Sequence, residues 1–486
     1  MHFSNYPSTP SEKPREAGIL HLGLGNFHRA HQAVYTANAL ERDGGDWGIV
    51  GVASRSHRIV DSMRAQGGAY SVITLSPTGP SADVFEVHTD LLVASEQLDE
   101  LNGYFASERI RIVTLTVSEN GYTYSHARKG LDVDSDVVKA DLAGGAPMTA
   151  IGQLASGLSE RYRRGGAPLT IVSCDNMNDN GAVTRSLVLQ FLAESKHLNG
   201  AGFSAWVESH VTFPSTMVDR IVPATENRHR DLSASLTGVR DNAPVPAEPF
   251  TMWVLEDDFA AGRPDWAGSG AIFTSDVRSF ELVKLRLLNS SNSLLSYLGL
   301  LSGNKFIAEG FANPRFRVVV EQLMRDEMLE TITVPDLIDV ETYIDQLFER
   351  FSNIDMEDRT IRVASDGSTK LPVRITEPVL YHHSRGGSSP VLALLLASYL
   401  RTFCDSDSYA AESTGRPDDP CAGLLADLGA RTHSSADLVT SVIVESGIFS
   451  PALAEATEWL DLVAEMLEIL RTHGVDFAID RALAQK

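Results

Sequence analysis

Cysteine, long apolar runs and basic residues are all scarce in this sequence of 486 residues. The three cysteines, Cys174, Cys404 and Cys421, show no CxxC spacing, which argues against a disulfide framework and a structural zinc site. No apolar run approaches the roughly 18 residues of a membrane span, and residues 1–16 lack the apolar core of a signal peptide. These absences predict a reducing compartment, and we expect the cytoplasm.

The shortage of basic residues has a consequence of its own. Lysine and arginine together number 41 against 64 aspartates and glutamates, which gives a net charge of −23. Nucleic acids and anionic membranes are bound by basic surfaces, so we expect neither as a partner. A small anionic substrate stays open, because a few local lysines and arginines are enough to bind one.

The remaining composition is typical of a soluble globular protein, with 43% hydrophobic and 22% charged residues. The chain is too long for one ordinary core, so two domains are expected. Its N-terminal part alternates strands and helices, which predicts a parallel sheet with both faces covered. We expect strands over 18–25, 46–54, 109–117, 168–176 and 250–258, and helices over 29–41, 149–164 and 182–194.

From about residue 276 the apolar pattern becomes helical. The sequence therefore predicts an α/β domain over 1–275 and a mainly helical domain over 276–486. We expect a loose tail over 1–16 and a loop over 406–420, and we find no internal repeat. The helices expected in the second domain cover 279–301, 314–330, 338–352, 389–405, 434–445 and 451–473.

A glycine turn follows the first expected strand. Gly23 and Gly25 lie where a strand runs into a helix, which is the context that lets backbone N–H groups approach a pyrophosphate in a Rossmann-type domain. The third glycine of the usual fingerprint is absent, because Phe27 and His28 occupy that region. The alternative interpretation is a tight turn without a ligand.

The segment after the second strand bears on the choice of dinucleotide. An acidic residue at this point favours NAD, because its carboxylate binds the ribose hydroxyls. Here Ala53 is followed by Ser-Arg-Ser-His-Arg, with no acid before Asp61. Arg55 or Arg58 can accept a 2′-phosphate, so the residues by themselves leave NADP open.

The segment KLRLLNSSN, from Lys284 to Asn292, carries polar side chains inside an apolar helix. At about 100° per residue, Asn289 lies roughly 140° around an α-helix from Lys284, and Asn292 roughly 80°. All three can therefore line one side of a cleft. A solvated surface lysine is the plainer alternative.

Several of these segments together resemble one family. KLRLLNSSN is similar to the catalytic-helix motif Lys-x4-Asn-x2-His of the polyol-specific long-chain dehydrogenases, with Asn292 at the histidine position. On these motifs the chain is identified as a member of that family over nearly its whole length. The other matching segments are GLGNFHRAHQAVYT at 23–36, TVSENGYTY at 116–124, SCDNMNDNG at 173–181, VTFPSTMVDRIVP at 211–223 and RVASDGSTK at 362–370.

The resemblance implies hydride transfer between a secondary alcohol and a nicotinamide, with named catalytic residues. Lys284 would be the base, which requires its pKa to fall from about 10.4 towards neutrality. Asn180 and Asn289 would clamp the reacting oxygen, since amides donate hydrogen bonds without titrating. Asp219 would tune Lys284 or relay protons. A structural ion pair with Arg220 or another arginine is the alternative for Asp219.

For the substrate, the resemblance implies C2 of a linear polyol or hexonate. The two leading pairs are D-mannitol with D-fructose and D-mannonate with D-fructuronate. Arg362 and Lys370 would contact substrate. The segment from Lys370 to Arg374, in which the arginine follows the proline by two residues, resembles that of the mannonate enzymes, and an extra arginine near the pocket would suit a substrate carboxylate. Asn292 is shorter than histidine and cannot take up a proton. Its presence favours a changed substrate such as arabinitol, a slower enzyme, or a silenced NAD- or sugar-binding relative.

For the cofactor, the resemblance implies NAD, because relatives with a similar turn after the second strand use NAD. NADP stays the alternative. No metal is expected, because the spacing of His28 and His31 has no further ligand to complete a site. A zinc hydrolase is disfavoured for the same reason. The only partner expected is a small sugar alcohol or sugar acid, and a monomer is compatible with the sequence. The residues expected to contact the cofactor are Gly23, Gly25, Phe27, Arg55 and Glu119.

Overall fold

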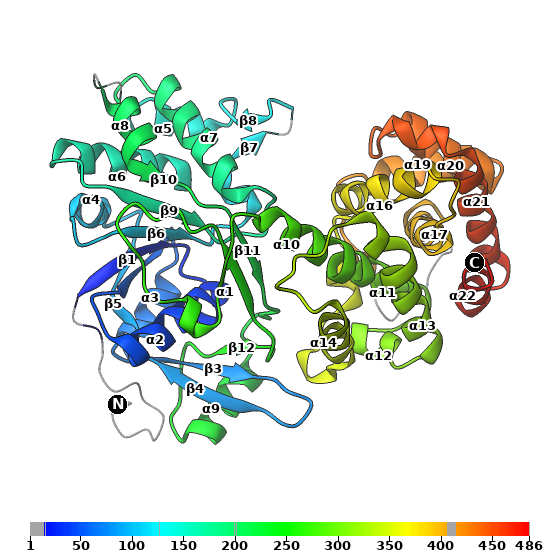
Figure 1. Cartoon of the computed structure of the whole chain (residues 1–486), viewed down its shortest axis with the longest axis horizontal. Helices are drawn as coiled ribbons and strands as arrows, with labels where there is room; N and C mark the ends of the chain where they lie inside the picture. The colour runs from blue at the N-terminus through cyan, green and yellow to red at the C-terminus, as the bar shows by residue number, and fades with distance from the viewer. Residues whose placement is uncertain are drawn as a thin grey trace. The chain divides into compact units, whose positions relative to one another are not determined.

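The chain consists of two compact units, residues 1–278 and 279–486, which are described separately (Figure 1). The division falls inside helix α10 (Val277–Val283). The computed structural model describes residues 14, 16–125, 127–198, 200, 202–405 and 415–485. Most of the expected tail and most of the expected loop over 406–420 therefore lie outside the described residues.

A six-stranded, wholly parallel sheet forms the centre of the first unit. Its strand order is β10-β9-β6-β1-β2-β5, so the chain leaves β1 towards β2 on one side and returns to β6 on the other. This is the order of a doubly wound nucleotide-binding fold, and it confirms the predicted α/β class. The strands are β1 (Ala17–Leu22), β2 (Gly48–Ala53), β5 (His88–Val93), β6 (Ile112–Leu115), β9 (Leu169–Ser173) and β10 (Val211–Thr212).

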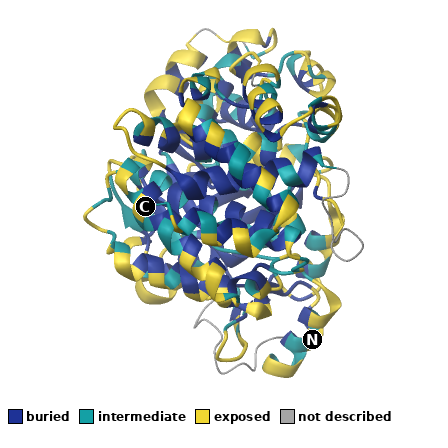
Figure 2. Cartoon of the chain, turned by 90° about the vertical axis from the view of Figure 1, so that its right-hand side faces the viewer, coloured by how far each residue is buried: buried dark blue, intermediate teal, exposed yellow. Residues whose placement is uncertain are grey.

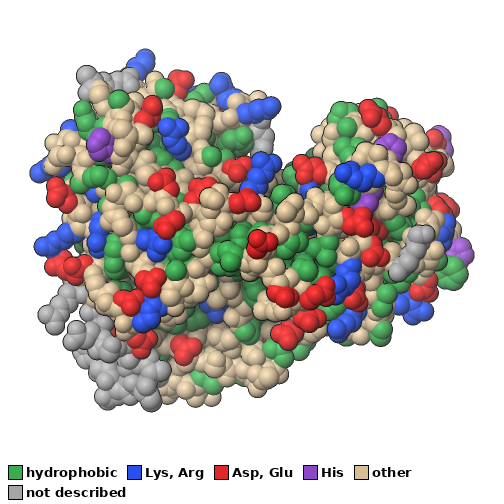
Figure 3. All heavy atoms as spheres, viewed as in Figure 1, with side chains coloured by type: hydrophobic (Ala, Val, Ile, Leu, Met, Phe, Trp, Pro, Cys, Tyr) green, Lys and Arg blue, Asp and Glu red, His purple; other side chains and the backbone are tan. Residues whose placement is uncertain are grey.

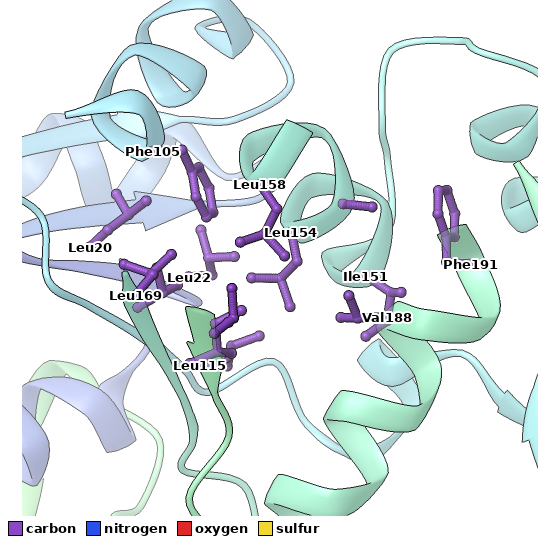
Figure 4. Close-up of a cluster of buried hydrophobic side chains, with 14 of the residues drawn as sticks. Leu20, Leu22, Phe105, Leu115, Ile151, Leu154, Leu158, Leu169, Val188 and Phe191 are labelled. Carbon is purple, nitrogen blue, oxygen red and sulfur yellow. The ribbon is translucent and has the colours of Figure 1, made fainter. Parts of the chain in front are cut away.

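Successive residues of each strand enter two different cores, because strand side chains alternate between the faces of a sheet. One core joins Leu20 and Leu22 of β1 to helices α4 (Leu98–Ala106), α6 (Ala150–Arg163) and α7 (Asn180–Glu194), as Figure 4 shows. Covering of both faces explains why the strands are apolar at nearly every position.

The other core lies on the opposite side of the sheet. It joins Ile19 of β1 to helix α2 (Gln32–Asp43) and to Trp253 and Trp266, whose ring centroids are 4.6 Å apart. Trp253 belongs to β13 (Met252–Leu255), the middle strand of a small sheet completed by β11 (Thr216–Asp219) and β14 (Ile272–Phe273).

The remaining elements of the first unit are short. Many of them were not predicted, because strands of two to five residues leave little periodicity to recognise. The expected helix over 29–41 is in fact two helices, since His31 breaks it with φ −127° and ψ −91°. The short elements are α1 (Asn26–Ala30), α3 (His57–Arg64), α5 (Asp136–Leu142), α8 (Phe203–His210), α9 (Asn227–Thr237), β3 (Tyr70–Thr74), β4 (Ser81–Phe85), β7 (Tyr124–Ser125), β8 (Gly130–Leu131) and β12 (Val245–Ala247).

Helices and the turns between them make up the described residues of the second unit, apart from one bridge between Phe306 and Arg359. Its central helix is α17 (Pro390–Cys404), where every residue except Arg401 is buried. Figure 2 shows how buried and exposed residues alternate along the helices. The other helices are α11 (Ser290–Leu301), α12 (Ile307–Phe311), α13 (Pro314–Gln322), α14 (Val340–Ser352), α15 (Thr360–Ala364), α16 (Gly367–His383), α19 (Ala422–Arg431), α20 (Ser435–Glu445), α21 (Thr457–Thr472) and α22 (Val475–Leu483).

In the described part of the chain, no helix combines the length and the apolarity that crossing a membrane requires.

Two of the predicted helices contain a π-helical turn. One covers Lys284–Asn289, between α10 and α11, and the other covers Leu323–Met328, after α13. Such turns are rare and are frequently found at functional sites. The first coincides with the segment that the sequence singled out.

The second π-helical turn carries a buried acid that caps α17. The two carboxylate oxygens of Glu327 accept hydrogen bonds from the backbone N–H groups of Val391 (2.7 Å) and Leu392 (2.8 Å). Burial nevertheless raises the pKa of Glu327 to about 8, although these two donors lower it in part. The backbone carbonyl of Glu327 also accepts a hydrogen bond from His382, so this histidine has a structural contact.

Glu327 should make the stability of the chain depend on pH. Its pKa rises on folding from 4.5 to about 8, so between these values the folded state holds the proton and the unfolded state does not. The free energy of unfolding should therefore fall as pH rises through this window, by up to about 1.4 kcal/mol per pH unit. Urea unfolding from pH 5 to 8 should show a shallower slope for Glu327→Gln, whereas Glu330→Gln, at an exposed position, should keep the original slope. Equal slopes in all three proteins would contradict this assignment.

Candidate cofactor cleft and catalytic helix

The turn after β1 leaves no room for a side chain. Gly23 has φ +104°, and a Cβ atom on it would lie 2.1 Å from the carbonyl oxygen of Thr116. The backbone N–H groups of Gly23 and Leu24 both donate to Val52 O at the end of β2. The turn is therefore held tightly between the ends of β2 and β6, and only glycine fits at its first position.

A cleft of about 920 Å³ opens beside this turn, at the carboxyl ends of β1, β2 and β6. Its volume is within the range of small-molecule sites, and its place is the point where the strand order reverses, which is where such folds bind dinucleotides. Its glycine and polar lining residues include Gly23, Gly25, Asn26, Arg29, Ser54, Arg55, Ser56, Arg58, Ser62, Ser118, Asn120, Thr149, Gln153, Thr225 and Arg230.

Three of the five residues expected to contact the cofactor line this cleft, namely Gly23, Gly25 and Arg55. Phe27 does not line it and instead packs beside His31, with ring centroids 5.0 Å apart. Glu119 does not line it either, although its neighbours on both sides do. Cofactor contacts by Phe27 and Glu119 stay predictions.

Buried histidines support the turn from below. The rings of His21 and His28 are stacked, with centroids 3.4 Å apart and planes 10° from parallel. His21 donates from Nε2 to Gly23 O (3.0 Å) and accepts at Nδ1 from the hydroxyl of Thr114 (2.8 Å). Burial lowers the pKa of His21 to about 3, so the ring is neutral at ordinary pH and can lie against a second imidazole without repulsion.

The pair His28 and His31, whose spacing raised the question of a metal, is engaged in packing. The Nε2 atom of His28 lies 3.1 Å from that of His88 in a hydrogen bond, and His31 donates to Met252 O (3.0 Å). Among the described residues, no group of three or more histidine, cysteine or acidic side chains has an arrangement that would hold a metal ion.

Asp175 organises one wall of the cleft, and the sequence analysis did not select it. Its carboxylate accepts hydrogen bonds from the backbone N–H groups of Val117 (2.9 Å) and Ser118 (2.8 Å) and from the Tyr122 hydroxyl (2.8 Å). Burial raises its pKa above the ordinary value, and these donors partly offset the rise. Ser118 has φ +63°, which is uncommon for a residue other than glycine. A carboxylate directly after a buried parallel strand was the available signal.

Asn180 is fully buried at the start of α7, and its amide joins three segments. Its N–H groups donate to the carbonyl oxygens of Ser173, Asp175 and Thr216, and its oxygen accepts from the Thr216 N–H (2.9 Å). In this arrangement Asn180 braces β9 against β11. A role as donor to a substrate oxygen stays a prediction, and it requires one of these hydrogen bonds to be exchanged.

Asp219 ends strand β11 and is 5% exposed. The guanidinium group of its neighbour Arg220 donates to the backbone carbonyls of Glu248 and Ala30. The catalytic role predicted for Asp219 stays a prediction.

In the second unit, the π-helical turn changes the geometry expected for the catalytic helix. The turn is closed by the N–H of Ser290, which donates to Leu285 O five residues back, and the Ser290 hydroxyl donates to the same oxygen (3.0 Å). A helix with i→i+5 bonds holds roughly four to five residues per turn. Five residues therefore make little more than one full turn, so Lys284 and Asn289 lie closer in angle than the roughly 140° of an α-helix.

Burial differs between neighbouring residues of this helix. Lys284, Asn289 and Asn292 are partly exposed, whereas the segments 286–288 and 290–291 are buried. The three polar residues of the motif are therefore accessible outside the helix core, and a joint contact with a ligand stays a prediction.

Helices α15 and α16 pack against α11 and carry the predicted substrate residues. Arg374 donates from Nη1 to Asn289 O (3.0 Å) and to the Ser293 hydroxyl, so it braces the end of the π-helical turn and the start of α11. Lys370 donates to Ser365 O (2.6 Å), and Arg362 forms an ion pair with Asp358. The structure brings these cations to the helices beside Lys284 and Asn289, and substrate contacts by them stay predictions.

A glycine-bearing turn links the helices that carry Arg362 and Lys370. Asp366 has φ +60°, a left-handed conformation that is uncommon for a residue other than glycine. A Cβ on Gly367 would lie 2.2 Å from the Tyr297 hydroxyl of α11, so this turn approaches α11 closely. The tight approach holds α15 and α16 beside α11.

The fold and the cleft define a protein with a dinucleotide-binding domain, and comparison with known proteins identifies its family. The family models for the mannitol dehydrogenase Rossmann domain and the mannitol dehydrogenase C-terminal domain match residues 17–268 and 276–471. This chain belongs to the mannitol dehydrogenase family. The family assignment made from the motifs is confirmed.

Individual relatives cover nearly the whole chain. D-mannonate oxidoreductase of Escherichia coli is 36% identical over 468 residues, covering 94% of this chain and 94% of its own. D-arabinitol 4-dehydrogenase of Ralstonia nicotianae is 37% identical over 398 residues, covering 81% and 84%. The structure of Pseudomonas fluorescens mannitol 2-dehydrogenase in a ternary complex with NAD and D-mannitol superimposes with a TM-score of 0.85, at 32% identity and 100% coverage of both chains.

Removing the Ser290 hydroxyl should disturb the alignment of Lys284 with Asn289. Ser290→Ala should lower kcat/KM about tenfold, the effect of losing one good hydrogen bond, because the side-chain bond to Leu285 O no longer reinforces the π turn. Ser296→Ala is the matched control, since Ser296 is also buried and donates to a helix carbonyl, that of Ser293 (2.9 Å), outside the π turn. Equal losses in both variants would mean that the π turn has no special role.

Asp175→Asn should weaken cofactor binding without unfolding the sheet. In the natural protein the N–H groups of residues 117 and 118 donate to the Asp175 carboxylate. The asparagine amide has one oxygen fewer to accept them and turns its own N–H group towards one of these donors, so residues 117–118 should lose their fixed position. We expect the dissociation constant of NADH, measured by fluorescence titration, to rise about tenfold. Asp134→Asn, at an exposed ion pair with Arg128, should leave it unchanged. An unaltered constant in Asp175→Asn would contradict the wall assignment.

Proposed function

We propose that this protein is a metal-independent dehydrogenase that transfers hydride between NAD(H) and C2 of a linear hexonate or polyol. The leading pair is D-mannonate with D-fructuronate, followed by D-mannitol with D-fructose. The observation that carries the proposal is the partial exposure of Lys284 and Asn289 on one π-helical turn, followed by Asn292, also partly exposed, in the first turn of α11. We also propose that unit 1–278 binds the dinucleotide and that unit 279–486 supplies the base and the substrate contacts.

The cleft of the first unit fits a nicotinamide dinucleotide. A Cβ on Gly25 would meet only Gly23 O, at 3.7 Å, so the lack of a side chain there leaves the backbone open to a pyrophosphate, and the cleft follows the ends of three adjacent strands. The nicotinamide, when bound, supplies the hydride acceptor or donor. Gly23, Gly25 and Arg55 would hold the dinucleotide.

Lys284 carries the proton transfer. As the alcohol is oxidised, its hydroxyl proton must leave to a base, and the Nζ atom of Lys284 takes it. The Asn289 amide donates to the developing alkoxide and does not titrate, which suits a fixed donor. We keep the roles inferred from the family for Asn180, as a second donor, and for Asp219, which would tune Lys284.

Basic side chains on the helices beside α11 favour a substrate that carries a carboxylate. Arg362, Lys370 and Arg374 belong to helices packed against α11, and each supplies donors suited to carboxylate or hydroxyl oxygens. The relative that acts on D-mannonate shares 36% identity over almost the whole chain. These two points together favour the hexonate over the polyol.

Asn292 supports a second candidate, a dehydrogenase for another polyol. Its side chain is partly exposed but is shorter than the histidine of the family motif, so a substrate with different hydroxyl geometry should suit it better. One relative, 37% identical to this chain, is a D-arabinitol 4-dehydrogenase, so we take arabinitol as the alternative substrate. A silenced binding protein is the third reading, and it predicts no turnover.

A substrate panel tests the reaction. Purified protein should oxidise NADH in the presence of fructuronate and more slowly with fructose, tagaturonate or xylulose, followed by loss of absorbance at the nicotinamide band. Lys284→Ala should lower kcat by at least about a hundredfold, because a general base contributes on that order. The matched control is Lys305→Ala, since Lys305 is exposed on the loop after α11. Full activity in Lys284→Ala would overturn the assignment of the base.

Asn292→His separates a weakened or redirected site from a silenced one. Restoring the family motif should raise kcat/KM for hexonate or mannitol about ten- to a hundredfold if one transition-state hydrogen bond was lost. A higher activity with arabinitol in the natural protein, lost in Asn292→His, would favour the second candidate. If NADH binds but neither protein turns over any member of the panel, the dehydrogenase proposal fails.

A further inference from the structure

The dinucleotide cleft carries no acidic side chain among its lining residues. Four arginines line it, Arg29, Arg55, Arg58 and Arg230, whereas neither aspartate nor glutamate does. This contrasts with a chain of net charge −23 and with the face in Figure 3, where acidic and basic side chains are interspersed. The cleft is therefore a basic site on an acidic protein, and its lining favours additional negative charge on a ligand.

The basic residues lie where dinucleotide folds discriminate between cofactors. Strand β2 ends at Ala53, and Ser54, Arg55 and Ser56 follow it directly into α3. In this fold a carboxylate after the second strand binds the ribose hydroxyls of NAD, and an arginine there accommodates the 2′-phosphate of NADP. The position where the carboxylate would stand has serine and arginine instead.

The two arginines of this segment are available to a ligand. Arg55 and Arg58 are exposed, and neither has a hydrogen-bond or ion-pair partner among the described residues. The neighbouring turn does bring one acid close, since Ser95 N–H donates to Ser54 O. That acid, Glu96, is hydrogen-bonded to His57, with 2.7 Å between Oε1 and Nε2, and is not paired with either arginine.

The other two arginines of the cleft differ in kind. Arg29 is buried, and its N–H groups are taken by Gly25 O, Ala243 O and Asn26 Oδ1. It holds the turn rather than a ligand. Arg230 is half-buried on α9 and donates to Asn227 Oδ1 (2.8 Å), a neutral acceptor that leaves its charge unneutralised.

We propose that the cleft binds NADP(H) as well as NAD(H), with Arg55 as the main contact of the 2′-phosphate and Arg58 as its support. The hydroxyls of Ser54, Ser56 and Ser62, which also line this end of the cleft, add uncharged donors that serve a phosphate or a ribose hydroxyl equally. This inference rests on the proposed dinucleotide site but not on the identity of the substrate. It makes the protein a dehydrogenase of dual cofactor use.

The test uses binding of adenosine fragments, which does not depend on turnover. Titration calorimetry of the full chain with 2′,5′-ADP and with 5′-AMP isolates the contribution of the 2′-phosphate, and NADPH and NADH are titrated in parallel. We expect 2′,5′-ADP to bind at least about tenfold more tightly than 5′-AMP, the effect of one charge-assisted hydrogen bond. This preference should weaken as salt is raised, because exposed charges are screened.

Variants identify the residues responsible. Arg55→Ala should weaken 2′,5′-ADP and NADPH binding about tenfold or more and weaken 5′-AMP and NADH binding by a smaller factor, so that the preference for the 2′-phosphate is lost. Arg55→Ala combined with Arg58→Ala should weaken 2′,5′-ADP and NADPH binding further. Arg55→Asp should exclude NADPH and retain NADH. Arg240→Ala, an exposed arginine outside the cleft, is the matched control and should change none of these values.

The outcomes distinguish this inference from the proposed function. Binding of NADH and 5′-AMP without any preference for 2′,5′-ADP would overturn dual cofactor use and leave the dehydrogenase proposal standing. A preference that Arg55→Ala and the double variant both retain would overturn the assignment to these arginines. Failure of both NADH and NADPH to bind would overturn the dinucleotide site itself.

Discussion

The cleft of this protein depends on the close approach of the backbone at Gly23 to the end of strand β6. With a Cβ position only 2.1 Å from Thr116 O, any larger residue would push β1 and β6 apart at the point where the sheet order reverses. That point is where the two halves of a doubly wound sheet diverge and leave space for a ligand. The cleft consequently depends on the strand ends and the turn together, and this arrangement forms without the third glycine of the usual fingerprint.

Buried polar side chains maintain this arrangement. His21 bonds the Thr114 hydroxyl of β6, and Asp175 and Asn180 bond backbone groups of neighbouring segments. Together these side chains tie the ends of β1, β6, β9 and β11. A buried polar group is tolerated only if its hydrogen bonds are made. These side chains therefore specify a single arrangement of the strand ends, whereas the apolar cores above and below provide most of the driving force.

In the helical unit, a π-helical turn positions the polar side chains of the motif. An α-helix would separate Lys284 and Asn289 around its axis, and the π turn brings them together at the expense of regular hydrogen bonding. Ser290 and Arg374 offset part of that cost, because each donates to a backbone carbonyl of the turn or its border. Arg374 illustrates how a residue inferred to contact substrate can have a structural role as well.

Much of the architecture could be derived from the sequence because local patterns encode it. The apolar strands, the change to helical periodicity near residue 276, the glycine turn and the motif from Lys284 to Asn292 are all local features, and they were sufficient for the fold class and the family. What the sequence alone could not determine was decided by contacts between distant segments. The π turn, the break at His31, the wall held by Asp175 and the bracing of Asn180 each depend on hydrogen bonds or packing to other elements. Short strands such as β11 and β12 likewise exist only because neighbouring strands pair with them, since so few residues cannot form a strand alone.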